Sequence, residues 1–261
     1  LAMITLALFA PRIAPYDPYE QNIMERFQPP FWMPEGSKAH PLGTDHVGRD
    51  ILSRIIYGSR VSLAVGFLAV LISAAIGVTL GIISGYRGGR EDTVISFAVN
   101  VMMAFPFILL AMVVVAVMGA SVKNIFICLG ITSWPIFTRL VRAEVMQLKQ
   151  MDFVISARAL GCSALRVVMS HIFPNLVSSI LVVATVEVAR AILRESFLSF
   201  LGLGIPPPIP SWGGMLSEGR AYMLHKWWLA AFPGLAIFLT ALGINLLGDG
   251  MRDYLDPHRE R

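Results

Sequence analysis

Ionisable residues that interrupt an apolar run are the first candidates for chemistry in this sequence of 261 residues. Glu187, Arg190 and Arg194 follow one another at spacings of three and four within the run 176–201, and Glu195 comes next. On a helix, these spacings place the first three residues on one face. Charges at membrane depth cost roughly 2.5 kcal/mol or more each unless they are paired or face water. The three residues could line a path on which an arginine meets a solute's carboxylate, or they could pair with one another or with a partner protein.

Other kinds of site find little support in the sequence. It holds no G-x-x-x-x-G-K-[ST] loop, so we do not expect this chain to bind ATP itself. Cys128 and Cys162 do not form a CxxC pair, and His40 and His46 lie close together without a third ligand. We therefore predict no catalytic residue, no metal site and no cofactor in this chain.

The composition indicates a membrane protein. Hydrophobic residues make up 56% of the chain and charged residues only 15%, and the mean hydropathy is +0.67. A soluble domain does not need so much apolar surface, and the net charge of +4 is better explained by basic loops than by nucleic-acid binding. A spanning helix needs about 20 apolar residues, which predicts an all-α membrane protein with about six spans: a truncated first span, then 61–85, 93–118, 122–141, 176–201 and 229–247.

The loops between the spans set the orientation and the domain boundaries. Lys and Arg are denser in the tail and in the loops after the second and fourth spans, which places these segments and both termini in the cytoplasm. The apolar run at Leu1 starts without a Met, so we expect that part of the first helix is missing. The predicted organisation is a truncated helix (1–14), an extracytoplasmic loop (15–60), a transmembrane domain (61–250) and a cytoplasmic tail (251–261).

Small residues and prolines predict how two of the spans behave. Gly77, Gly81 and Gly85 recur every four residues, which is the small-xxx-small pattern of closely packed membrane helices. Pro106 interrupts the third span and predicts a kink there.

The cytoplasmic loop 145–175 carries the most informative pattern. Its segment from Met151 to Asn175 has the pattern of two short helices broken at Gly161, and Pro174 marks the start of the next span. The pattern alone is compatible with a protruding knob and also with an ordinary amphipathic interfacial helix.

This segment resembles the cytoplasmic coupling loop of binding-protein-dependent ABC permeases, in which a Glu-Ala-Ala sequence is followed after three residues by Gly and later by Pro. Gly161 and Pro174 fit that pattern, and six further blocks in the same order resemble the dipeptide, oligopeptide and nickel permease family, in the form of the second of its two permease subunits. The blocks are LGTDHVGRDILSR from Leu42, RLVRAEV from Arg139, SFLGLG from Ser199, PSWGGMLSEGR from Pro210, FPGLAIFLT from Phe232 and NLLGDGMRDYLDP from Asn245.

The resemblance implies a type I ABC importer permease fold with a cytoplasmic coupling helix, in the cytoplasmic (inner) membrane of a bacterium. It also implies a heterodimer with a second permease subunit, two cytoplasmic ATPase subunits that bind ATP and Mg, and an extracytoplasmic solute-binding protein. Members of the family carry dipeptides, oligopeptides, glutathione-like peptides or nickel chelates, so peptides are the expected substrates and the exact one stays open.

The resemblance also assigns residues. Two-state motion of the ATPases would be passed to the helices through the coupling loop. The family's Glu-Ala-Ala is Ile155, Ser156 and Ala157 here, so no ionic role of that glutamate can be carried over. The coupling residues that the resemblance implies are Ser156, Ala157, Arg158, Ala159, Leu160, Gly161, Cys162, Ser163, Ala164 and Leu165.

The polar block before the second span has two interpretations. Asp45, Arg49 and Asp50 are charged residues among turn formers, and they could dock the binding protein. They could equally pair among themselves in a tightly hydrogen-bonded loop. An ion-coupled secondary transporter or channel is the rival function for the whole chain, because broken helices and intramembrane charges would serve it too, although no inverted repeat is visible.

Overall fold

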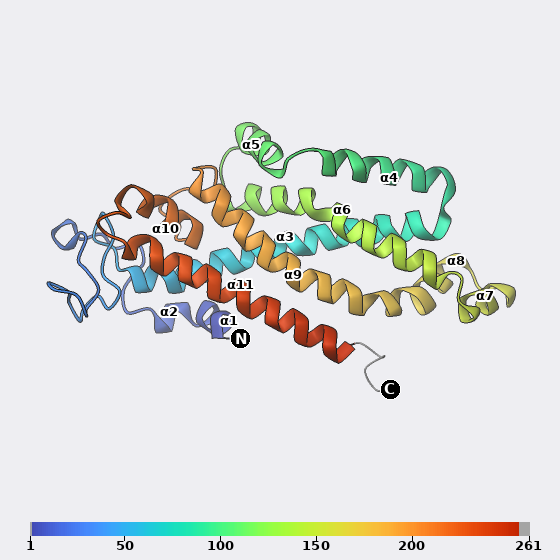
Figure 1. Cartoon of the computed structure of the whole chain (residues 1–261), viewed down its shortest axis with the longest axis horizontal. Helices are drawn as coiled ribbons and strands as arrows, with labels where there is room; N and C mark the ends of the chain where they lie inside the picture. Colours follow the sequence, from blue (N-terminus) through green and yellow to red (C-terminus); the bar gives the residue numbers. More distant parts are fainter. Residues whose placement is uncertain (1, 256–261) are drawn as a thin grey trace. The chain divides into compact units, whose positions relative to one another are not determined.

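The computed structural model describes residues 2–255. Every regular element within that range is a helix or a helical turn. The only β-type contact there is an isolated bridge between Thr44 and Asp50. The all-α prediction is confirmed. Figure 1 labels the larger helices. In chain order the elements are α1 (Ala2–Leu8), α2 (Ala10–Ile13), the 3-10 turn Ile23–Glu25, α3 (Ile51–Arg87), α4 (Gly89–Ala104), α5 (Phe107–Met118), α6 (Val122–Leu148), α7 (Asp152–Ala159), α8 (Ala164–Val167), the π-turn Val168–Ile172, α9 (Phe173–Phe200), α10 (Trp212–Gly219), the 3-10 turn Arg220–Tyr222 and α11 (Trp228–Leu255).

The apolar helices correspond to the predicted spans. Within residues 2–255, four stretches are long and apolar enough to cross a membrane, and α4 and α5 together form a bent fifth candidate. These five cover the second to sixth predicted spans, whereas α1 and α2 are too short to cross. Of the predicted tail 251–261, the structure describes residues up to Leu255. The four stretches are Ile51–Arg87, Val122–Leu148, Ala164–Phe200 and Trp228–Tyr254.

Two helix boundaries differ from the predicted ones for local reasons. The loop predicted for 15–60 ends ten residues early, because Asp50 caps α3: its Oδ2 accepts a hydrogen bond from the Ser53 backbone N–H at 2.7 Å. The third span breaks rather than kinks, with an angle of 88° between α4 and α5. Phe105 is extended there, as the residue before a proline prefers to be.

The chain forms two compact units, and their boundaries fall inside the long helices. The first unit comprises residues 1–67, 111–126 and 189–243. The second comprises residues 68–110, 127–188 and 244–261.

In the first unit, Trp212 joins α10 to the start of α3. Its side chain is fully buried, its backbone N–H donates to Ser62 Oγ at 3.2 Å, and its indole Nε1 donates to the Ile55 carbonyl at 3.0 Å. Beside it, Ile51, Met215 and Leu229 belong to one apolar cluster. The first turns of α3 therefore have fixed neighbours from the C-terminal part of the sequence.

In the second unit, the glycine row of α3 lies directly against α6. A Cβ atom built on Gly77 would lie 2.5 Å from the Cβ of Phe137 and 2.5 Å from the Trp134 carbonyl oxygen. A Cβ atom on Gly81 would lie 2.8 Å from the Cβ of Val141, and one on Gly85 would lie 2.8 Å from the Cβ of Val145. The close helix packing predicted from the glycine spacing is confirmed.

Replacing Gly77 by alanine should therefore destabilise the protein by about 1 to 3 kcal/mol, because the contact includes backbone that cannot move aside cheaply. The matched control is Gly243→Ala in α11, where an added Cβ would have no atom within 4 Å in the described part of the chain. Thermal unfolding of the purified protein compares them. An unchanged midpoint for Gly77→Ala would show that the two helices are not in tight contact.

Candidate functional site

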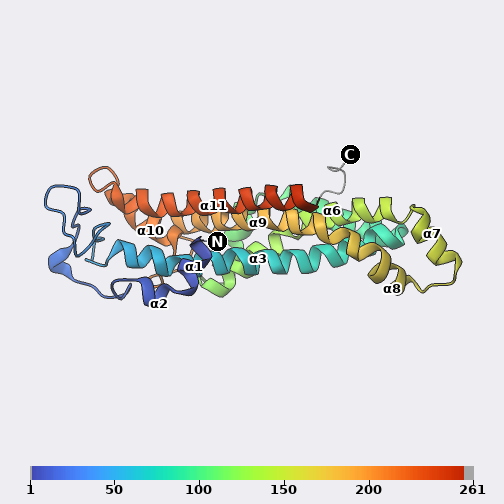
Figure 2. The ribbon, with the colours of Figure 1, turned by 90° about the horizontal axis from the view of Figure 1, so that it is seen from below.

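The coupling segment predicted from the sequence is a compact two-helix element of the second unit. Figures 1 and 2 show α7 and α8 beyond the C-terminal end of α6. The turn between them is at Gly161, whose φ of +83° is in the left-handed region that glycine tolerates best. The Gly161 N–H donates to the Arg158 carbonyl and the Cys162 N–H to the Ala157 carbonyl, at 3.0 and 3.1 Å. This is the pairing of a Schellman motif, which ends α7 and turns the chain sharply.

One side of this element belongs to the core of the second unit. Val154 and Val167 are fully buried, and they pack in a cluster with Val145 of α6 and with Ile172 and Leu176. The element is thus attached to the ends of two membrane helices by apolar packing. A force on α7 and α8 would reach those helices without an intervening flexible linker.

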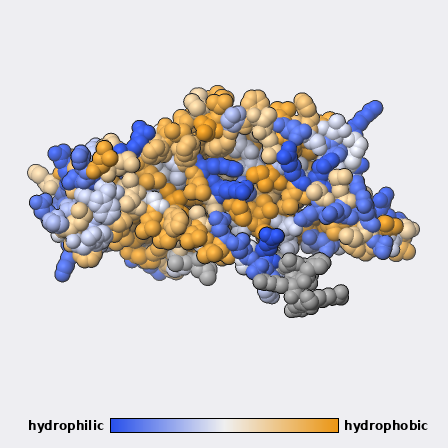
Figure 3. Space-filling model, viewed as in Figure 1, coloured by the Kyte–Doolittle hydropathy of each residue, from blue (hydrophilic) through white to orange (hydrophobic). Residues whose placement is uncertain are grey.

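The opposite side of the element is exposed and partly apolar. Leu160 is 85% exposed and Leu165 is 73% exposed, one on each side of the glycine turn. Figure 3 shows hydrophobic side chains among hydrophilic ones at this end of the second unit. Of the ten residues predicted for coupling, Ala157 is buried, Cys162 is half-buried, and the other eight are exposed. A rigid turn with two projecting leucines is suited to a cleft on another protein.

The predicted fifth span starts earlier than expected, because α8 is continuous with α9. It runs without a break from Ala164 to Phe200, and a π-turn at Val168–Ile172 comes just before Pro174. Proline lacks the backbone N–H that an α-helix needs, and π-turns are one way in which helices accommodate such interruptions. The sequence indicated the proline but not the continuity of the helix across it.

The charged residues of α9 occupy different environments. Glu187 and Glu195 are buried, Arg194 is half-buried and Arg190 is exposed. Glu187, Arg190 and Arg194 each have an interaction partner, and Glu195 accepts a hydrogen bond from Ser199 Oγ at 2.7 Å. The pairing alternative and the path alternative both remain compatible with this arrangement.

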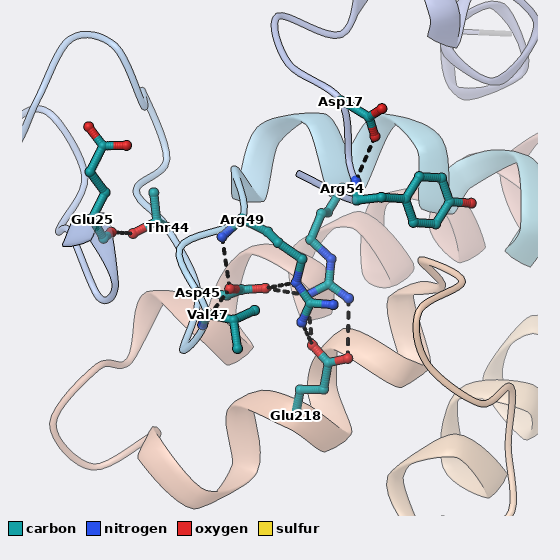
Figure 4. Close-up of polar contacts among 9 residues, drawn as sticks. Asp17, Glu25, Thr44, Asp45, Val47, Arg49, Arg54 and Glu218 are labelled. Atoms are coloured by element: carbon teal, nitrogen blue, oxygen red, sulfur yellow. Dashed lines mark hydrogen bonds and ion pairs between the residues drawn. The ribbon is translucent and has the colours of Figure 1, made fainter. Parts of the chain in front are cut away.

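A buried ion cluster in the first unit joins the N-terminal loop to α10 (Figure 4). The guanidinium groups of Arg49 and Arg54 lie between the carboxylates of Asp45 and Glu218. Both arginines bond to Asp45 Oδ2 at 2.6 Å. Both also bond to Glu218 Oε2, Arg49 at 2.7 Å and Arg54 at 2.6 Å. The Asp45–Arg49 pair was one of the sequence alternatives. Arg54 and Glu218 were not predicted, because no spacing rule connects residues 164 positions apart.

The Asp45 carboxyl shows how these charges act. Its burial raises the pKa, but the charges of Arg54 and Arg49 and the backbone N–H groups of Arg49 and Val47 lower it, and the pKa lies below its usual 3.8. Asp45 is therefore held ionised across the physiological pH range.

The pKa of Asp45 predicts an acid-dependent loss of stability. A carboxyl whose pKa is lower in the folded state stabilises the fold fully above its unfolded pKa, and this contribution disappears as the pH falls through the folded pKa. The stability advantage of the wild-type protein over Asp45→Asn should hold at neutral pH and shrink below about pH 4. Thermal unfolding of both proteins between about pH 6 and about pH 3 measures it, and a constant difference across that range would contradict the lowered pKa.

The three residues considered for docking all have structural partners. Asp50 caps α3 and its Oδ1 lies 2.9 Å from His40 Nδ1, while Asp45 and Arg49 belong to the ion cluster. All three are at most 4% exposed. This burial favours the structural alternative for their side chains, and docking stays a prediction for the loop around them.

A metal-like grouping lies beside the cluster. Ligand atoms of Asp45, His46 and Glu218 fall within 4.8 Å of one another. Arg49 and Arg54, however, bond to both carboxylates, and two positive charges at this distance oppose a cation. The grouping is better explained as part of the ion cluster.

Comparison with known proteins identifies the class. The family described as "Binding-protein-dependent transport system inner membrane component" matches residues 77–261, and the "N-terminal TM domain of oligopeptide transport permease C" matches residues 1–30. The chain belongs to this family of membrane permeases.

Individual relatives are similar over nearly the whole chain. The dipeptide transport system permease protein DppC of Haemophilus influenzae is 45% identical over 257 residues, which are 98% of this chain and 87% of the relative. The glutathione transport system permease protein GsiD of Escherichia coli O6:K15:H31 is 47% identical over 258 residues, 98% of this chain and 83% of the relative.

Solved structures support the fold. A chain of an inward-facing methionine ABC transporter, MetNI, has a TM-score of 0.65 and 16% identity, covering 77% of this chain and 96% of its own. A chain of an amino acid ABC transporter crystallised with histidines has a TM-score of 0.61 and 17% identity, covering 77% and 94%. The fold is that of ABC importer permeases, as the resemblance implied.

Proposed function

We propose that this chain is one of two permease subunits of a bacterial importer that takes up short peptides through the cytoplasmic membrane. The observation that carries the proposal is the similarity to relatives named for dipeptide, di/tripeptide and glutathione transport, at 43 to 47% identity over 98% of the chain. The common cargo chemistry of these relatives is a short peptide with a free carboxylate.

The coupling segment is the proposed contact with an ATPase subunit. The exposed leucines at 160 and 165 would enter a cleft of that partner, and the buried valines at 154 and 167 would pass its movement to α6 and α9. Energy would come from ATP and Mg bound by two partner ATPases, since this chain has no nucleotide loop of its own. The chain would act by coupling rather than by catalysis.

The charged residues of α9 are proposed as part of the path. Glu187, Arg190 and Arg194 share a helix face by their spacing, and an exposed guanidinium at membrane depth needs water or a partner. A second, homologous permease subunit would supply the other half of the path, and an extracytoplasmic solute-binding protein would deliver the peptide to the N-terminal loop.

Co-purification tests this assembly directly. A tagged form of this chain, expressed with its chromosomal neighbours, should retain one second permease and two ATPase subunits in detergent. The test variant combines Leu160→Asp with Leu165→Asp and is compared with the wild-type chain. It should lose the ATPases and keep the second permease, because it places charge on the exposed apolar contact. A chain that purifies alone and transports with an ion gradient would overturn the proposal in favour of a secondary transporter.

A further inference from the structure

The second unit contains a polar cavity between α4 and α6. Its volume is about 250 Å³, and apart from one valine its lining is polar. Two of its lining residues, Asn100 and Arg139, are exposed. The lining residues are Ser96, Val99, Asn100, Thr138, Arg139 and Arg142.

The two arginines of this cavity differ in how their charge is balanced. Arg142 donates to both carboxylate oxygens of Asp92, through Nε at 2.5 Å and Nη2 at 2.8 Å. Arg139 instead donates through Nη2 to the neutral side-chain oxygen of Asn100 at 2.9 Å. No carboxylate of residues 2–255 is within salt-bridge distance of it. The cavity therefore presents one unbalanced positive charge, with the Asn100 NH₂ group as a neighbouring donor.

Arg139 and Asn100 lie inside their helices rather than at the helix ends. Asn100 is eleven residues from the start of α4 and Arg139 is nine residues from the end of α6, or about 17 and 14 Å along the helix axes. Val94 and Phe97, which are 67% and 69% exposed, lie between Asn100 and the start of α4. Charged side chains inside membrane helices face water or protein rather than lipid.

We propose that this cavity binds the carboxylate terminus of the peptide while it crosses the membrane. A guanidinium pairs with a carboxylate through parallel N–H···O bonds, and the hydroxyl and amide groups beside it suit the adjoining peptide unit. The volume of about 250 Å³ has room for a carboxylate and a small residue. This inference rests on the proposed function and adds the group of the substrate that the permease recognises.

The test measures binding to the complete complex in nanodiscs, without nucleotide. The probe is radiolabelled dialanine, competed by unlabelled dialanine and by dialanine amide, with glutathione as a second carboxylate probe. Wild type should prefer the acid over the amide by tenfold or more. Arg139→Gln should lose this preference. Asn100→Asp should lose it too, because it places an internal carboxylate beside the guanidinium, and Arg139→Lys should keep part of it.

The matched control is Lys123→Gln, which removes an exposed basic residue of α6 outside the cavity and should keep the wild-type preference. An acid preference that survives in Arg139→Gln, or a wild type that binds acid and amide equally, overturns the proposal. Loss of the second permease from the Arg139→Gln complex also overturns it, because the missing carboxylate would then belong to that subunit. Peptide uptake by the wild-type complex is measured in parallel, so failure of the proposed function shows separately.

Discussion

Replacing Gly161 by valine should reduce peptide uptake at least tenfold while ATP hydrolysis and membrane insertion persist. Gly161 has a φ of +83°, where a β-branched residue is strained by about 1 to 3 kcal/mol. That energy shifts the equilibrium of the turn toward another conformation by a factor of about 5 to 150. The Schellman motif would open, and the leucines beside it would no longer be held rigidly. Uptake and hydrolysis are measured on the same proteoliposomes.

Two variants separate the backbone effect from other causes. Gly161→Asn should retain most of the uptake, because asparagine adopts left-handed φ values more readily than other residues do. Gly119→Val imposes the same strain at a φ of +79°, outside the coupling segment, and should keep hydrolysis and uptake linked. Uptake at the wild-type level by Gly161→Val would contradict the coupling role of this turn.

Replacing Asp45 by alanine should cost roughly 3 kcal/mol of stability, the second largest effect that we expect. Asp45 accepts bonds from the guanidinium groups of Arg49 and Arg54, whose side chains are 5% and 2% exposed. Without Asp45, two buried positive charges share the single carboxylate of Glu218. The penalty arises from charge that is desolvated and incompletely paired.

The matched control is Asp17→Ala, which removes an exposed carboxylate whose bond is to the backbone of Tyr19 nearby. It should change stability by less than about 0.5 kcal/mol. Chemical or thermal unfolding in the same detergent compares the variants. A loss of similar size in both would show that the ion cluster contributes no more than a surface carboxylate does.

Local patterns predicted the parts of the fold that depend on local physics. Apolar length located the second to sixth spans, glycine spacing predicted the contact of α3 with α6, and a glycine between two short helical patterns predicted the coupling turn. Pro106 predicted a kink, whereas α4 and α5 are separated by a break with an angle of 88°.

Contacts between distant residues could not be predicted in this way. Glu218 meets Arg54 across 164 positions, and no local spacing pattern connects the two residues. The Arg139 cavity has the same origin, because its two walls come from different helices and only their packing brings Asn100 to the guanidinium. The sequence placed Arg139 at the end of a span of 122–141, whereas α6 continues to Leu148 and leaves it inside the helix.

Peptide uptake by the reconstituted complex tests the central claim most directly. This chain, the second permease and the two ATPases are placed in proteoliposomes with ATP inside, and labelled dipeptide is added outside with the binding protein. We expect accumulation that requires ATP, the binding protein and this chain together, and that stops when any one of them is omitted. Accumulation that continues without ATP and follows an imposed ion gradient would contradict it.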